Sequence, residues 1–329
     1  MTTPMPLSNA PYVSPETLIT APTGIDWTSI PPDDDATPAQ NAAEMWNMCQ
    51  RATAAVNGYC NQVLRATLDN EYFQGPDFRV TVGPGAGGAS SPAYWFANPG
   101  TYNARIILSR FPILAVNSVS TCPSPTFPLS WTALPAGYFR AEKPPIGIYG
   151  SVSPDSSAFG GQAIIVAPGY IDWSQGRNGW AIWVQYVNGF PHCEITASAA
   201  AGAMSLTVDD CTGWGITNWA GQAGATGVIK DSGQQETLHV SSASVTSGPG
   251  TLTLSTALVY PHQAGTLFTT LPASIEEACI LFATAEALTR GATSTTIHDI
   301  GGHAQNTGGD VAGLKTEAEL LCHPFRVTI

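Results

Sequence analysis

The pattern of apolar and polar positions first separates an N-terminal arm from a helix. Residues 1–36 are rich in Pro, Thr and Asp, which predicts an extended arm with at most one short helix, started by Ser14-Pro15-Glu16. Thr37-Pro38 then offers a favourable N-cap followed by a proline at the first helical position, and Gln40 completes a capping box. Apolar residues recur at helical spacing up to about residue 64, so a long helix is expected there.

Between residues 66 and 190 the pattern changes to strands. Segments rich in β-branched and aromatic residues alternate with turns that contain Gly, Pro or Asn. Strands are therefore predicted at 78–82, 105–108, 113–116, 162–166 and 180–186. The stretch from Gly83 to Gly100 is rich in Gly, Ala and Ser, and it is predicted to be a long loop.

Residues 194–270 show a third pattern, in which short β-like pieces are separated by turn residues. These pieces lie at 205–208, 227–229, 237–240, 251–254 and 266–268. Their size and spacing predict a small β-barrel or sandwich. Trp214, Trp219 and Phe268 would supply its core, so this module is expected to fold autonomously as an insertion.

Helical patterns return in the C-terminal part. Ser274 and Glu277 form an apparent capping box after Pro272, and Gly291 is placed to end the helix. A polar, Gly-rich linker over 291–310 leads to a last short amphipathic helix, which a proline at position 324 stops.

This order predicts an α+β fold, with helices packed on a mostly antiparallel β-sheet body and a small all-β inserted domain. The expected division has four parts. They are an extended arm (1–36), a body of helix plus strands (37–193), the inserted barrel or sandwich (194–270), and C-terminal helices that complete the body and end in a tail (271–329).

Composition narrows the function. Hydrophobic residues make up 43% of the chain and charged residues only 11%, and the formal net charge is −12. No basic cluster is present to grip nucleic-acid phosphates, which excludes a wrapping or sequence-specific DNA binder. So few charges protect a surface poorly against self-association, which suits a protein that works inside an assembly. Neither a signal peptide nor a membrane-spanning run is expected.

The motifs that could carry chemistry are weak. Gly83 to Gly88 fits G-x-G-x-x-G, but no helix can start directly after it, as a dinucleotide site requires. The pairs His298 with His303, Cys322 with His323, and His192 with Cys193 do not have zinc-site spacing. The seven cysteines are scattered, which favours buried, reduced thiols. No cofactor, metal or catalytic residue is expected, and the protein is expected not to be an enzyme.

Nine tryptophans offer an alternative function. Trp173, Trp180 and Trp183 lie within eleven residues, and carbohydrate-binding modules use such aromatic platforms. However, Trp180 and Trp183 fall on opposite faces of one predicted strand, which favours core on one side and an interface on the other. A monomeric carbohydrate-binding or tail-associated module stays open as an alternative, as does an acidic hydrolase with an unrecognised site.

Four segments, with Trp131 and Gly137-Tyr138 between the first two, resemble a known family in their order. Arg110 to Val119 is similar to an "R-x-P-V-x-x-V-x-x-V" strand, and Val184 to Phe190 is similar to a "V-x-Y-x-x-G" strand. The helix from Pro272 to Gly291 is similar to a "P…A…A…R-G" segment, and Glu317 to Arg326 is similar to an "E-L-L-x-P-Y-R" tail. Their order resembles the head–tail adaptor family of tailed phages, the gp6-like connectors, over about 37–193 and 271–326.

The resemblance implies a structural virion protein at the head–tail interface, assembled in the host cytoplasm. Its partners would be the portal protein, a stopper or neck protein of the tail, and further copies of itself in a twelve-fold ring that passes double-stranded DNA without binding it. Residues 194–270 would be an addition on the outer rim. The C-terminal segment would order on binding the portal through Leu320, Leu321, His323, Pro324, Phe325 and Arg326.

Overall fold

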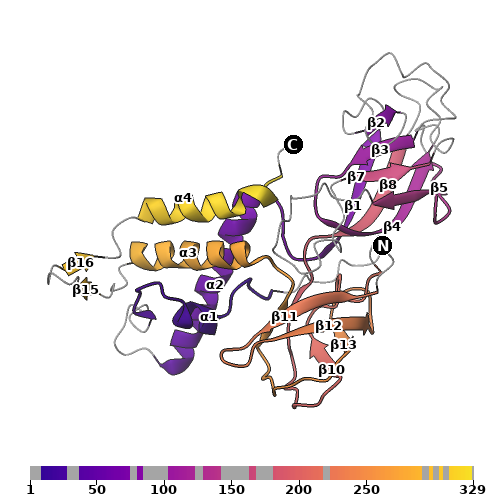
Figure 1. Ribbon diagram of the computed structural model, residues 1–329. Coiled ribbons are helices and arrows are strands. Elements are labelled where there is room, and N and C mark those ends of the chain that lie inside the picture. Colours follow the sequence, from indigo (N-terminus) through magenta and orange to yellow (C-terminus); the bar gives the residue numbers. More distant parts are fainter. Residues whose placement is uncertain are drawn as a thin grey trace. The chain divides into compact units, whose positions relative to one another are not determined.

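The structure is a computed structural model, and its secondary structure confirms the α+β class, with four α-helices and antiparallel sheets among the residues it describes (Figure 1). It describes residues 9–27, 37–74, 80–83, 103–122, 129–141, 163–167, 181–217, 223–290, 296–298, 304–306 and 311–327. The predicted loop after Gly83 and the G-x-G-x-x-G segment that begins there lie outside these residues.

Contacts divide the chain into two compact units, and the division differs from the expected one. Unit 1 contains the described residues of Met1–Leu64, Pro191–Cys211 and Thr226–Thr328. Unit 2 contains those of Arg65–Phe190 and Thr212–Ala225. The helices were expected to form one body with the strands of unit 2, but their contacts group them with the 194–270 module.

The helices of unit 1 begin largely where local sequence signals place them. In α1 (Pro15–Thr20), Ser14 is the N-cap and its hydroxyl accepts a hydrogen bond from the Thr17 amide. In α2 (Pro38–Cys60), both bonds of the predicted Thr37–Gln40 capping box are present. The helix ends because the next residue adopts a left-handed conformation with φ of 54°.

The predicted capping box of the next helix is wrong. Helix α3 (Ala273–Thr289) has Pro272 as its N-cap, and no side chain bonds to the first amides. Ser274 therefore lies inside the first turn and not before it. The last helix, α4 (Val311–Cys322), is followed by a 3₁₀ turn, η5 (His323–Phe325), which contains the proline expected to stop it. Within the predicted linker, β15 (Thr296–His298) and β16 (Ala304–Asn306) form a hairpin.

The helices bury their apolar stripes against one another. Helix α3 packs along both α2 and α4, and α2 also contacts α4 and α1 (Figure 1). An ion-pair network joins α2 to α3, because Glu44 bonds to Arg51 and Arg290, and Arg290 also pairs with Glu286 at 3.0 Å. Burial alone raises the pKa of Glu44, but Asn47 and the two arginines outweigh it and lower that pKa below its ordinary value.

The described part of the N-terminal arm is an integral part of unit 1. Tyr12 is buried, and its backbone amide donates to the Thr53 hydroxyl at 2.9 Å. The Tyr12 hydroxyl donates to Asn57 at 2.7 Å and accepts from the Leu64 amide at 2.9 Å. The arm is therefore fastened to α2 at two successive turns and does not extend freely over residues 9–27.

The module expected at 194–270 is a closed six-stranded barrel that begins two residues earlier, with a strand at His192–Glu194 that was not predicted. Its strands are β9 (His192–Glu194), β10 (Ser205–Val208), β11 (Ala225–Lys230), β12 (Glu236–Ala243), β13 (Gly250–Leu254) and β14 (Leu267–Thr269). They pair in the order β10-β13-β12-β11-β14-β9. Beyond β9, Ile195 bridges Val208, and the Thr196 amide donates to the Thr207 carbonyl at 2.9 Å. These bonds join the last strand of the sheet to the first, β10, so the sheet closes on itself. Of the two predicted forms, the module is therefore a barrel and not a sandwich.

A buried histidine ties two loops of this barrel together. His262 is fully buried, and its Nδ1 lies 2.8 Å from Asp231 while its Nε2 lies 2.7 Å from Glu236. Glu236 also accepts the backbone amides of Val259 and Tyr260, at 3.0 and 3.3 Å. The hairpin turn between β11 and β12 is thereby fixed to the segment that leads into β14.

Unit 2 is built from two four-stranded antiparallel sheets. The first has the order β1-β8-β4-β5 and contains β1 (Thr67–Gln74), β4 (Ile113–Cys122), β5 (Thr132–Ala133) and β8 (Ala181–Asn188). The second has the order β2-β3-β7-β6 and contains β2 (Val80–Gly83), β3 (Asn103–Ile107), β6 (Phe139–Ala141) and β7 (Ala163–Val166). All five predicted strands of this region are present at or near their expected positions.

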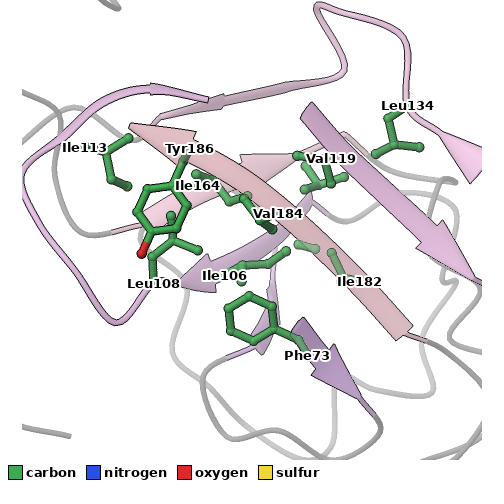
Figure 2. Close-up of a cluster of buried hydrophobic side chains, with 12 residues drawn as sticks. Phe73, Ile106, Leu108, Ile113, Val119, Leu134, Ile164, Ile182, Val184 and Tyr186 are labelled. Atoms are coloured by element: carbon green, nitrogen blue, oxygen red, sulfur yellow. The ribbon is translucent and has the colours of Figure 1, made fainter. Parts of the chain in front are cut away.

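The two sheets share one apolar core, which Figure 2 shows. Phe73, Val184 and Val119 come from the first sheet, and Ile106 and Ile164 come from the second. A common core packed from two inner faces is the arrangement of a β-sandwich. Of the three residues expected in the core of the barrel module, Phe268 is fully buried in it, and Trp214 is buried but its segment is grouped with unit 2. Trp219 lies outside the described residues.

Replacing the buried His262 is expected to destabilise the protein strongly. We expect His262→Ala to lower the free energy of unfolding by about 3 kcal/mol, because two carboxylates lose their hydrogen-bonded partner in a buried site. Urea denaturation measures this effect. The matched control is His239→Ala, since the His239 ring has one bond of 3.0 Å to the Thr226 hydroxyl, and equal losses in the two variants would contradict the role of His262.

Glu236 predicts a dependence on pH. Burial alone raises its pKa, but bonds from the Val259 amide, His262 and the Tyr260 amide outweigh it, so the folded pKa lies below the ordinary value. This contribution to stability is complete above the ordinary pKa and is lost as pH falls through the folded one. The difference in unfolding free energy between wild type and Glu236→Gln should therefore shrink as pH falls from neutral to below the ordinary pKa of a carboxyl group. A constant difference over that range would contradict the assignment.

Candidate assembly surfaces

The C-terminal segment, which sequence patterns assign to the portal interface, contains two kinds of residue. Leu320 is 68% exposed, and His323, Pro324 and Arg326 are exposed as well. Leu321 is half-buried, and Phe325 is only 3% exposed. Phe325 therefore belongs to the core of its own unit, and the outward surface of the segment consists of Leu320 with His323, Pro324 and Arg326, here called the C-terminal patch.

Four contacts hold the segment that carries this patch against the end of α2. The Gln62 amide nitrogen donates to the Phe325 carbonyl at 2.7 Å, and the Val327 amide donates to the Cys60 carbonyl at 2.9 Å. The Cys60 thiol lies 3.8 Å from the Cys322 carbonyl. The guanidinium of Arg326 stands over the Tyr59 ring at 5.1 Å, a cation–π distance. The expectation of a tethered tail that orders only on binding is therefore wrong for residues 311–327.

The cysteines serve packing in this region. All seven are buried, as expected. Burial raises the pKa of the Cys49 thiol to about 12, and a side-chain bond with Cys322, together with burial, raises the pKa of Cys60 well above its ordinary value. Thiols in this state stay protonated at neutral pH and act as small apolar groups.

A second surface lies on unit 2, where aromatic side chains gather on the outer face of the β1-β8-β4-β5 sheet. Tyr72 and Trp183 are paired across β1 and β8, and each is 44% exposed. Trp131 contacts both, at ring-centroid distances of 5.9 and 6.0 Å. Leu68, 42% exposed, lies on the same face. We call these four residues the aromatic strip. Trp173 and Trp180, from the predicted cluster, lie outside the described residues.

The face around the strip is uncharged. Paired residues of adjacent antiparallel strands share a face, so Asn70, Gln185 and Ser118 lie beside the strip, and Ser120 pairs with Trp183. The only ionisable carboxylates in the four strands are Asp69 and Glu71, which alternate onto the opposite face.

Both carboxylates on that opposite face have partners. Asp69 accepts from the Thr67 hydroxyl at 2.8 Å and from Asn188, and Arg110 lies 3.7 Å away. Glu71 accepts from the Tyr186 hydroxyl and from the Ser109 amide. Burial and the Glu71 carboxylate raise the pKa of Tyr186, so its hydroxyl remains a donor.

Comparisons with protein-family models, curated proteins and solved structures found no match. Within the described residues, no cluster of three or more His, Cys, Asp or Glu side chains is arranged to bind a metal ion. The same part of the chain contains no helix that is long and apolar enough to cross a membrane. The function of the two described surfaces is therefore inferred from their geometry and chemistry alone.

Substitution of the two kinds of C-terminal residue is expected to change the free energy of unfolding by very different amounts. Phe325→Ala should lower the free energy of unfolding by about 3–5 kcal/mol, because it leaves a cavity in a packed core. Leu320→Ala should change it by less than about 0.5 kcal/mol, because that side chain is mostly in water. Thermal and urea unfolding of both variants provides the measurement. A stable Phe325→Ala protein would contradict the docking of the segment onto α2.

Proposed function

We propose that this protein is a structural component of a phage virion, a head–tail adaptor whose copies form a ring between the portal and the tail. The observation that carries the proposal is the C-terminal patch. Leu320 projects an apolar side chain into solvent from a helix that is fixed by core residues on its other side. Exposed apolar anchors on a rigid element are typical of protein-binding sites.

The location of the four family-like segments supports the proposal. Three of them correspond to packed elements, namely β4, α3, and α4 with η5. The Val184 to Phe190 segment lies at the end of β8 and pairs with β1 and β4. Each segment therefore lies in a packed helix or strand, where residues that a family shares for its fold are expected.

In this proposal the partner of the C-terminal patch is the portal protein, and the tail side of the ring meets a stopper or neck protein. DNA passes the ring without specific contact, since the chain is acidic. The alternative, a monomeric carbohydrate-binding or tail-associated module, rests on the tryptophan cluster and on the inserted β module.

The test is attachment to DNA-filled, tail-less heads of the phage that encodes this chain. Leu320→Asp should abolish co-sedimentation with the heads, because a carboxylate would be buried against the portal without a partner. Its melting temperature should stay at the wild-type value. The matched control is Val259→Asp, because Val259 in the barrel module is similarly exposed, at 66%, and this variant should attach normally. Normal attachment of Leu320→Asp, or no attachment of the wild type, would overturn the proposal.

A further inference from the structure

We propose that the aromatic strip is a self-association surface, on which the chain contacts a second copy of itself. This inference deepens the proposed function, on which it rests, by naming the contact that joins neighbouring copies. The strip is defined by described residues of unit 2 alone, namely Leu68, Tyr72, Trp131 and Trp183.

The first argument is electrostatic. Each copy carries a formal charge of −12, so two copies repel each other at a distance. This repulsion opposes association least where the approaching surface carries no carboxylate. The outer face of the β1-β8-β4-β5 sheet meets this condition, because Asp69 and Glu71 both lie on the other face and are hydrogen-bonded there. Burying this face in a contact with another copy therefore desolvates no ion of the face itself.

The second argument is the chemistry of the side chains. Trp and Tyr are enriched at the centres of protein interfaces, where they give large apolar areas for little loss of conformational entropy. Here they are surrounded by short hydroxyl groups and amides, such as Ser118, Ser120 and Gln185, which can hydrogen-bond at the rim. In an isolated chain, Tyr72 and Trp183 each leave 44% of their surface in water.

The ring geometry favours a protein over a sugar as the occupant. A flat glycan platform needs aromatic rings that are coplanar. Trp131 instead meets Tyr72 at an interplanar angle of 81° and Trp183 at 63°, so the contacts are edge-to-face. The strip is therefore an uneven apolar surface, which fits the irregular side chains of a protein partner better than the flat face of a pyranose.

The first experiment is site-specific crosslinking in the full-length protein. A photoreactive benzoylphenylalanine replaces Trp183 in one preparation and Tyr260, a 42% exposed residue of the barrel, in the other. Irradiation at high protein concentration should give covalent dimers from the first preparation and far fewer from the second. Mass spectrometry of the dimers identifies the residues contacted on the second copy.

The second experiment measures self-association by sedimentation velocity across a concentration series. Trp183→Glu should raise the dissociation constant roughly tenfold or more, since it places a charge at the centre of the contact. Leu68→Lys, which changes the same face without touching the aromatic contacts, should also weaken association. Tyr260→Glu should match the wild type. Near-ultraviolet circular dichroism checks that each variant is folded.

Two results would overturn the inference: self-association that Trp183→Glu and Leu68→Lys leave unchanged, or none at any concentration together with no crosslinks from position 183. Binding of neutral glycans that requires Trp183, without self-association, would also overturn it in favour of the carbohydrate reading. Failure of the proposed function is a separate result. In that case the wild type self-associates through the strip but does not attach to heads.

Discussion

The return of the C-terminal segment to the end of α2 is the contact on which the rest of unit 1 depends. The Gln62 side chain bonds to the carbonyl of Phe325 across a sequence separation of 263 residues. Tyr12, from the N-terminal arm, bonds at the same end of α2, to Asn57 and Leu64. Residues 57–64 thus bind segments from both ends of the described sequence. Closing so long a loop costs conformational entropy, which the buried contacts must offset.

This closure explains why the helices group together although the strands of three sheets separate α2 from α3 in sequence. Helix α2 ends one residue before a left-handed Asn61, and the chain then leaves for unit 2. It comes back at Pro191, enters the barrel through β9, and leaves it through the neighbouring strand β14 into α3. Lys230 of β11 pairs with Glu276 of α3 at 2.6 Å, which fastens barrel to helix. The chain enters and leaves unit 2 at bridged residues, Arg65 and Phe190, and it enters and leaves the barrel through paired strands, β9 and β14. The helices can therefore pack together although long segments separate them in sequence.

Local signals in the sequence predicted the elements well because those signals act over a few residues. Thr37 and Gln40 make a capping box between residues three positions apart, and alternating Leu and Thr residues identify β10 and β13 of the barrel. Strand β1 was not predicted, because Asp69, Asn70 and Glu71 are poor strand formers. It forms because Asp69 and Glu71 find partners that are more than 100 residues distant, Asn188 and Tyr186. No local pattern contains that information.

The same limit applies to the surfaces. Phe325 and Leu320 are both large apolar residues near the C-terminus, and sequence alone assigned both to an interface. Only the fold separates the one that fills the core from the one that projects. Likewise, Trp131 and Trp183 meet because β4 pairs with both β5 and β8, which is a non-local arrangement. None of these three strands contains a charged residue, and the two carboxylates of neighbouring β1 lie on the opposite face. Successive side chains of β1 point to opposite faces of the sheet, so Asp69 and Glu71 lie on one face and Leu68 and Tyr72 on the other. In this way an acidic chain has an uncharged face although the strand beneath it contains two carboxylates.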